Sequence, residues 1–512
     1  MIAVDKQCKI ITALQERRRI EEAIRQLAHL SLPKETEGQA RRIANMGDQV
    51  LPTLTSLLDT SNPRFLGALG LVAAHMDRQE IAPALHDVAA WSGQSDRIRL
   101  AAMLILERFL GQELDESLYA GLRSPEETVA QSLVEMVDQA SQDRDILQEY
   151  VRAIEQQSDD VIALVFDIVG NLGPERAVLP FWALAQSKRQ DVAELALHHL
   201  GSLRSPASAI MLQALLPTLS PTRRPVAERS LRKLQFSGVN VPSLCPPQPS
   251  WRSLVSPIDS RGYQSVWFLF DPSQDAPVQM LSVLLNNLTG IQNVACDHDG
   301  ELAQCLPSER RLGVIHQVVF PGAPAALPLL ETTFDAGRHL VWEALAAGYA
   351  QEREPPLNYA TLSDALWKWE IRQGEKWPQL DPPSVAEVAA SSPHIASLLD
   401  HVAFETWLVQ SEALSHVVRE VGWEALFRRS PESAASLDDL IRWHFSPEAI
   451  ARYRHRLERM AGWLWLAGEA KMARLALVAA ITLKEIAPEN HPLAQHMVVR
   501  GIAIALREMG LE

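Results

Sequence analysis

Metal-binding residue types are concentrated in one short stretch of the sequence. Two thiols, an imidazole and two carboxylates fall within ten positions: Cys296, Asp297, His298, Asp299 and Cys305. Thiolates and imidazoles are the usual ligands of zinc, but a closed tetrahedral site pairs them at spacings such as C-x2-C or H-x3-H. The spacing C-x-H-x6-C lacks that pairing. Cys296, His298 and Cys305 are therefore weak metal candidates beside the simpler interpretation as ordinary loop cysteines, and we expect no metal or other cofactor.

A second group with possible chemistry lies on a helix predicted over residues 331–350. Glu331, Asp335 and His339 recur every four residues, so a helix would place them on one face, where they could bind a ligand or transfer protons. A solvated helix surface is the simpler interpretation. Phosphate loops of the GxxxxGK type, GxSxG elbows and HExxH pairs are absent from the sequence. An enzyme is thus not indicated, and a lyase-like or metal-dependent enzyme is kept only as the second alternative.

Basic and aromatic residues alternate near the carboxyl end. The candidate binding residues are Arg442, Trp443, Arg452, Tyr453 and Arg456. Such residues can stack on bases and neutralise phosphates, which makes a nucleic-acid-associated protein the first alternative function. The simpler interpretation is a helix docked within the protein, with arginine stems covering apolar surface. A net charge of −15 also disfavours broad nucleic-acid binding, because phosphate neutralisation supplies most of that affinity.

The composition is that of a folded protein with several domains. The chain has 512 residues, of which 47% are hydrophobic and 22% charged. Glycine or charged residues interrupt every apolar run well before the roughly 20 residues that a membrane span requires, so no membrane insertion is expected. The amino terminus does not resemble a signal peptide, and four scattered cysteines fit a reducing compartment. We therefore expect a cytoplasmic protein with protein partners; its oligomeric state stays open.

The elements that would position these residues begin with a repeat of helix pairs. The first helix of each pair carries an anchor residue, at Pro52, Pro83, Leu118, Tyr150, Pro180 and Leu212, separated by 31, 35, 32, 30 and 32 residues. The second helices start near Asn62, Ser95, Ser124, Ser158, Lys188 and Pro221. Ser and Asn cap orphan amides at a helix start, and Pro fits the first helical position. Two independent markers thus share one period, in the range of helical solenoids.

This pattern resembles HEAT repeats, including the phycobilin-lyase-like subgroup, among the armadillo-like folds. The resemblance covers residues 15–236 and implies an α-solenoid over residues 1–236. Because scaffolds and adaptors dominate this family, the resemblance implies a non-enzymatic scaffold that binds a protein on the solenoid surface. It supplies no catalytic residue, although a tetrapyrrole lyase would be the enzymatic form that related repeat proteins suggest.

The remaining chain divides into a linker and two domains. Residues 237–250 are rich in proline and predict a linker, because proline fixes φ and removes a hydrogen-bond donor. Residues 251–353 predict a small α+β domain. Its expected antiparallel strands lie over residues 252–257, 262–271, 278–286 and 312–319, with a helix near 301–305.

The last predicted domain, residues 354–512, is helical. Ser446, Pro447 and Glu448 form a strong helix start. The final helices are expected over residues 447–467, 472–486 and 492–509. The predicted fold class is therefore mainly α, with an amino-terminal solenoid, a small α+β middle domain and a helical carboxy-terminal region.

Overall fold

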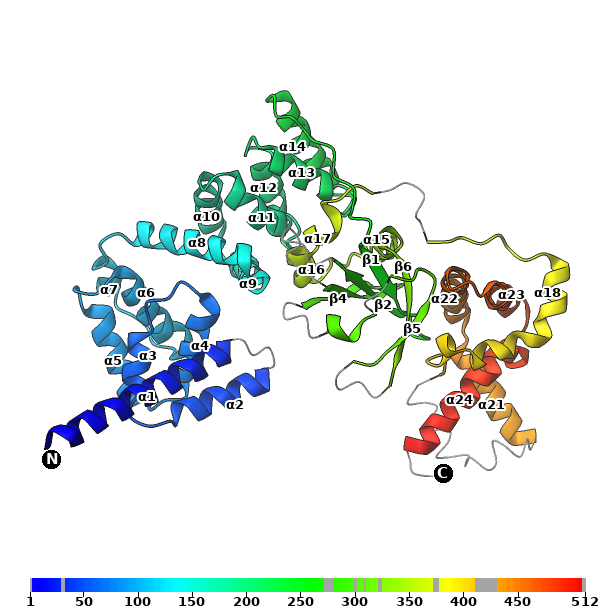
Figure 1. The fold of residues 1–512 in the computed structure, drawn as a ribbon, viewed down its shortest axis with the longest axis horizontal. Coiled ribbons are helices and arrows are strands. Elements are labelled where there is room, and N and C mark those ends of the chain that lie inside the picture. The colour runs from blue at the N-terminus through cyan, green and yellow to red at the C-terminus, as the bar shows by residue number, and fades with distance from the viewer. Residues whose placement is uncertain are drawn as a thin grey trace. The chain divides into compact units, whose positions relative to one another are not determined.

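The computed structural model describes a mainly helical chain with one small antiparallel sheet (Figure 1). The residues it describes are 2–28, 33–270, 280–297, 302–307, 310–320, 325–371, 377–409 and 431–508. No helix among these residues is long and apolar enough to cross a membrane.

The described residues up to Phe236 form a series of helices joined by turns and short loops. They are α1 (Ile2–Ala28), α2 (Pro33–Ala44), α3 (Val50–Ser56), α4 (Pro63–Ala74), α5 (Arg78–Ala90), α6 (Asp96–Leu104), the π-helical turn η1 (Ile105–Phe109), α7 (Glu116–Ala120), α8 (Pro125–Gln142), α9 (Arg144–Glu155), α10 (Asp159–Asn171), α11 (Pro174–Leu184), α12 (Gln190–Leu200), α13 (Pro206–Leu215) and α14 (Arg224–Phe236). All six predicted anchors lie in helices, and the predicted starts of the second helices are confirmed to within three residues. The Asn62 side chain, for example, accepts hydrogen bonds from Arg64 N and Phe65 N.

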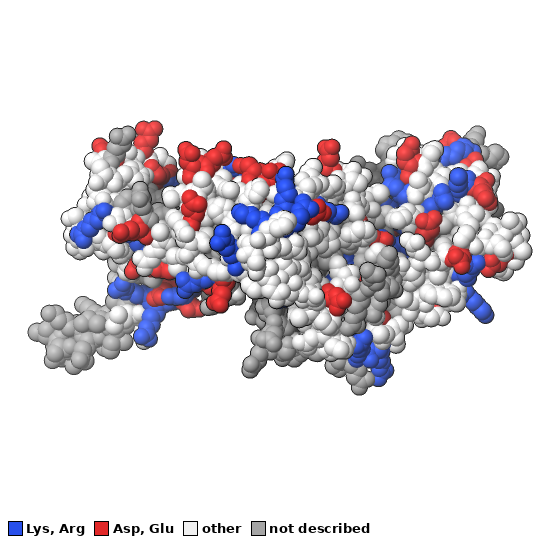
Figure 2. All heavy atoms as spheres, turned by 90° about the horizontal axis from the view of Figure 1, so that it is seen from above, with Lys and Arg blue, Asp and Glu red and all other residues white. Residues whose placement is uncertain are grey.

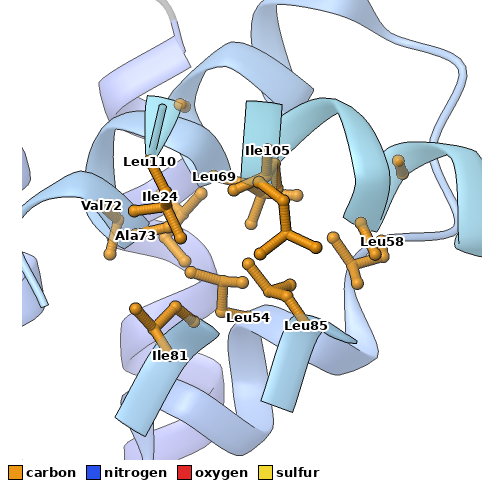
Figure 3. Close-up of a cluster of buried hydrophobic side chains, with 14 of the residues drawn as sticks. Ile24, Leu54, Leu58, Leu69, Val72, Ala73, Ile81, Leu85, Ile105 and Leu110 are labelled. Atoms are coloured by element: carbon orange, nitrogen blue, oxygen red, sulfur yellow. The ribbon is translucent and has the colours of Figure 1, made fainter. Parts of the chain in front are cut away.

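Buried aliphatic side chains hold the first helices together (Figure 3). Leu69 and Val72 point inward from α4 at helical spacing and meet Leu54 of α3 and Leu85 of α5. Ile105 of η1 reaches the same cluster, and each of these side chains is less than 2% exposed. Burial of such side chains contributes about 2 kcal/mol each, so this cluster is what fixes the mutual positions of α1 to η1.

By contacts, the chain divides into two compact units whose boundary crosses the sequence three times. Unit 1 comprises Met1–Leu212 and Val226–Val241, and unit 2 comprises Gln213–Pro225 and Pro242–Glu512. Residues 251–353 and 354–512, which the sequence assigns to separate domains, both fall within unit 2.

The segment Gln213–Pro225 is joined to the rest of unit 2 by polar contacts. Trp342 Nε1 donates to the carbonyl oxygen of Pro217 at 3.2 Å, and the Tyr349 hydroxyl donates to that of Thr218 at 2.9 Å.

Unit 2 contains a six-stranded antiparallel sheet in the order β4-β3-β2-β1-β6-β5. Its strands are β1 (Arg252–Val255), β2 (Tyr263–Leu269), β3 (Met280–Asn286), β4 (Gly290–Asp297), β5 (Ile315–Val318) and β6 (Leu327–Thr333), with a 3-10 turn, η2 (Ala303–Cys305), between β4 and β5. The four predicted strands are confirmed, whereas β4 and β6 were not predicted. The helix predicted to begin at residue 331 begins instead at Phe334, because β6 pairs with β1 up to Thr333.

One face of the sheet packs on α15 (Phe334–Ala350), which lies against the strands in Figure 1. Phe268 of β2 meets Phe334 with ring centroids 5.4 Å apart, and Leu340 and Val341 of α15 are buried. The opposite face carries a smaller cluster that includes Leu254 and Leu329.

Helices complete the unit after the sheet. They are α16 (Leu357–Leu362), α17 (Asp364–Trp367), α18 (Val385–Ser391), the 3-10 segments η3 (Ser392–Asp400) and η4 (Val402–Phe404), α21 (Pro431–His444), α22 (Pro447–Leu466), α23 (Ala470–Glu485), the 3-10 turn η5 (Pro488–Asn490) and α24 (Pro492–Glu508). The three final predicted helices are confirmed. The Ser446 side chain caps α22 by accepting a hydrogen bond from Ala449 N at 3.3 Å, as its position before Pro447 predicts.

Candidate functional site

A groove of about 590 Å³ in unit 1 is a candidate for binding a partner. Its lining includes residues of α1, α4, η1 and α9. The apolar part of the lining is formed by Leu27, Ala28, Ala68, Leu71 and Phe109, and the charged part by Arg64, Arg108, Asp145, Glu149 and Arg152. The groove brings together side chains that are 81 positions apart in the sequence, at Arg64 and Asp145. Its shape therefore depends on the packing of helices that are distant in the sequence.

Close packing at Gly70 places an aromatic ring in the groove. A Cβ atom at Gly70 would lie 2.4 Å from the Phe109 ring, so only glycine permits this approach between α4 and η1. Phe109 closes the π-helical turn, in which Leu110 N donates to the carbonyl oxygen of Ile105 at 3.1 Å. π-Helical turns occur frequently at functional sites. This one presents two neighbouring residues, Arg108 and Phe109, to the groove.

The charges of the groove do not balance. Arg64 pairs with Asp145 at 3.0 Å and lies 3.9 Å from Glu149, which also pairs with Arg152 at 2.7 Å. Arg108 forms no ion pair with any residue that the structure describes. Three guanidinium groups thus face two carboxylates, and pairs at a partly exposed surface contribute only about 0–1 kcal/mol and exchange easily. The groove can accept one further negative group beside its apolar floor.

The basic and aromatic residues singled out near the carboxyl end do not form one exposed face. Arg442 is half exposed and pairs with Asp439 at 2.7 Å and Glu489 at 2.9 Å. Trp443 and Arg452 are exposed, whereas Tyr453 and Arg456 are buried. On the face of the molecule seen in Figure 2, acidic and basic side chains are interspersed.

The inner side of α22 binds the sheet. Arg456 Nη1 donates to the carbonyl oxygen of Ser260 at 2.5 Å, and Arg456 Nε donates to Asn287 Oδ1 at 3.3 Å. Trp463 Nε1 donates to the carbonyl oxygen of Val255 at 2.9 Å. Burial lowers the pKa of Arg456 and raises the pKa of Tyr453 to about 12. These residues dock a helix within unit 2, as the simpler interpretation of the pattern predicts.

The three weak metal candidates cannot all be followed in the structure. Cys296 pairs in register with Leu281, on the sheet face that packs on α15. Cys305 packs against the cluster on the opposite face, together with Leu254 and Leu329. The two thiols therefore lie on different sides of the sheet, and His298 lies outside the described residues. Within the described ranges, no group of three His, Cys, Asp or Glu residues could hold a metal ion.

The predicted acid–base face over Glu331, Asp335 and His339 is wrong, because Glu331 lies on β6 and not on the helix. Its carboxylate is fully buried, pairs with Arg252 Nη1 at 3.0 Å and lies 3.0 Å from His316 Nε2.

The two remaining members of that trio have separate partners on α15. Asp335 pairs with Arg338, and His339 Nε2 lies 3.3 Å from Glu343 Oε1. The three residues thus take part in three separate interactions, and the cluster that the sequence suggests does not exist.

A smaller cavity of about 280 Å³ in unit 2 was not predicted. It lies between α15, α22 and the turns at the ends of β2 and β3, and its lining includes Gly262, Asn287, Glu343, His455 and Arg459. Arg459 Nη2 donates to Glu343 Oε2 at 2.5 Å. Burial acts to raise the pKa of Glu343, but the hydrogen bond from His339 and the charge of Arg459 lower it overall. Burial and the nearby Arg459 charge lower the pKa of His455.

Known proteins offer no template for either site. Neither family models, nor curated proteins, nor solved structures gave a match to this chain. The function is therefore argued from the residues and the geometry above.

Proposed function

We propose that this protein is a non-enzymatic scaffold or adaptor that binds a protein partner on the helical array of residues 1–236. The proposed architecture is a HEAT-like α-solenoid. It is supported by two sets of periodic markers that both coincide with helices, as repeats of αα-hairpins require. The observation that carries the proposal is the groove of unit 1, which combines an apolar floor with Arg108, whose guanidinium forms no ion pair among the described residues.

The chemistry of the groove favours a protein segment that carries an apolar side chain beside an acidic one. Leu27, Leu71 and Phe109 offer apolar surface to the first, and Arg108 offers a charge-assisted hydrogen bond to the second. Arginine and aromatic residues dominate the binding energy of protein interfaces. A helix that presents both side chains on one face, or an extended segment, fits this pattern of contacts.

The test combines cross-linking with charge reversal in the full-length chain. A photoreactive amino acid at Leu71 should capture a partner, which is then purified and its affinity measured by calorimetry. Arg108→Glu should weaken the binding about tenfold or more, because it replaces an attractive charge with a repulsive one. The matched control is Arg229→Glu, an exposed arginine on α14 that does not line the groove. Equal affinities for the two variants, or cross-links only to unit 2, would overturn the proposal.

A further inference from the structure

Arg456 carries a buried positive charge that forms no ion pair with a described carboxylate. Its side chain is 5% exposed, and its two hydrogen-bond acceptors, Ser260 O and Asn287 Oδ1, are neutral. Among the described residues, no carboxylate forms an ion pair with Arg456. The nearby carboxylate of Asp259 offsets part of this charge without forming an ion pair, and it accepts hydrogen bonds from the amides of Arg261 and Tyr263 at 2.9 and 2.7 Å. A buried charge without an ion-pair partner is costly, so a further negative group would stabilise this corner of unit 2.

Asn287, beside Arg456, has an amide donor for which no described residue supplies an acceptor. A guanidinium can only donate, so the Asn287 oxygen must face Arg456 and the Nδ2 atom must point away from it. Nδ2 is buried and has no hydrogen-bond partner within the described part of the chain. Buried polar groups are nearly always paired, and Asn287 lines the 280 Å³ cavity, which is where an acceptor could be supplied.

Glycine at position 262 makes this corner possible. Gly262 has a φ of +93°, and a Cβ atom there would lie 2.0 Å from Asn287 Oδ1 and 3.0 Å from Arg456 Nε. Only glycine permits both this backbone conformation and the approach of Asn287 to Arg456. The turn therefore holds the amide of Asn287 in a fixed direction.

The opposite wall of the cavity adds further donors. Arg459, whose side chain is 10% exposed, gives one bond to Glu343, which His339 also contacts. A guanidinium has five N–H donors, so Arg459 keeps hydrogen-bonding capacity beyond this pair. Arg459 and Glu343 thus form a charged pair in the cavity wall, and behind the wall Arg456 donates hydrogen bonds to neutral oxygens.

We propose that this cavity binds a small organic carboxylate. The carboxylate oxygens accept hydrogen bonds from Asn287 Nδ2 and Arg459, and the negative charge compensates Arg456. The volume of 280 Å³ lies just below the range of pockets for drug-sized ligands, so the occupant is a small metabolite-like acid. This site lies in unit 2 and does not depend on the function proposed for the groove of unit 1.

Thermal unfolding of the full-length chain tests the proposal. Acetate, succinate and glutamate are titrated as sodium salts against sodium chloride at equal ionic strength, and inorganic phosphate serves as a second anion. At least one carboxylate should raise the Tm of unit 2 in a saturable manner, because a ligand that binds only the folded state stabilises it. No rise above that in chloride for any carboxylate, or a saturable rise with phosphate alone, would overturn the proposal.

Two substitutions separate ligand binding from general stability. Asn287→Asp places a permanent carboxylate beside Arg456, so it should raise the Tm without ligand and abolish the response to carboxylates. Asn171→Asp makes the same charge change at an exposed position of α10 in unit 1 and should change neither. Ala346→Phe, at an exposed position of the cavity lining, should block the cavity and weaken binding about tenfold or more while leaving Arg456 and Asn287 intact. A carboxylate response that survives both Asn287→Asp and Ala346→Phe places the binding elsewhere and contradicts the proposal.

Discussion

The groove of unit 1 and helix α22 of unit 2 use the same residue types in opposite ways. In the groove, Arg64 and Arg152 form ion pairs with carboxylates at a partly exposed surface. Arg108, beside Phe109, forms no ion pair with a described residue. On α22, Arg456 lies over the ring of Tyr453 at 5.4 Å and donates to neutral oxygens in the interior. Arginine beside an aromatic residue therefore does not by itself indicate a binding face. What decides is whether the folded chain supplies backbone acceptors to the guanidinium.

The largest loss of stability should follow from replacing Trp463, the buried tryptophan of α22. Trp463 is fully buried and its Nε1 donates to Val255 O, so Trp463→Ala removes packing and leaves a carbonyl oxygen without its donor. We expect unit 2 to lose about 4 kcal/mol of unfolding free energy, measured by urea denaturation. Trp443→Ala on the exposed side of α21 is the control and should change little. Similar losses in both variants would contradict the inward docking of α22.

Protonation of a buried histidine should cause the next largest loss of stability. His491 is fully buried, its Nε2 lies 3.0 Å from Thr482 Oγ1, and burial lowers its pKa to about 4. The unfolded chain keeps a pKa near 6.5, so it binds more protons than the folded chain between these values. The free energy of unfolding of unit 2 should therefore fall by about 3 kcal/mol as the pH falls from about 6.5 to about 4.

Substitution of His491 provides the control for this pH dependence. In His491→Gln, the part of the pH dependence due to this residue should disappear from unfolding curves measured at each pH. Unchanged curves for the variant would show that other groups cause the loss of stability in acid.

Removal of the Arg456 side chain should lower the stability of unit 2 by an intermediate amount. Arg456→Ala breaks two charge-assisted hydrogen bonds but also removes a buried charge that has no ion-pair partner among the described residues. The two terms oppose each other, and we expect a net loss of about 2 kcal/mol, measured by urea denaturation of unit 2. A gain in stability would mean that the desolvation of this charge costs more than its hydrogen bonds contribute.

The smallest change in unfolding free energy is expected for Arg108, and it tests the contrast with Arg456 most directly. Arg108→Ala should change the unfolding free energy of unit 1 by less than about 0.5 kcal/mol, because this exposed side chain has no ionic partner in the described part of the chain. Partner binding should nevertheless weaken, as proposed for the charge reversal at this position. A large loss of stability in Arg108→Ala would assign Arg108 a structural role like that of Arg456.

Local signals allowed much of the helical fold to be predicted. Asn62 and Ser95 cap helices through bonds to amides two or three residues away, so the sequence alone marks these starts. Strand β6 was missed because it runs directly into α15, with Thr333 as the cap between them. Its identity as a strand depends on pairing with β1, far earlier in the chain, and a local pattern does not contain that information.

The sites depend even more on contacts between distant segments. Gly262, Asn287 and Arg456 come from two turns and a helix, and no spacing connects them. The sequence did place Arg456 among the residues of interest, but for a role on the surface. Whether an arginine of an amphipathic helix points outward or inward is decided by the tertiary acceptors, here the carbonyl oxygen of Ser260 and the amide oxygen of Asn287.

The segment Gln213–Pro225 has a consequence for how this chain is made and divided. Since α14 returns to unit 1 after this segment, no single cut yields two continuous fragments that each contain one whole unit. A fragment that begins at Pro242 lacks Pro217 and Thr218, which accept hydrogen bonds from Trp342 and Tyr349. During synthesis the segment emerges more than a hundred residues before those partners. The carbonyl oxygens of Pro217 and Thr218 therefore lack these two donors on the nascent chain until α15 has left the ribosome, and unit 2 is completed by residues made long before it.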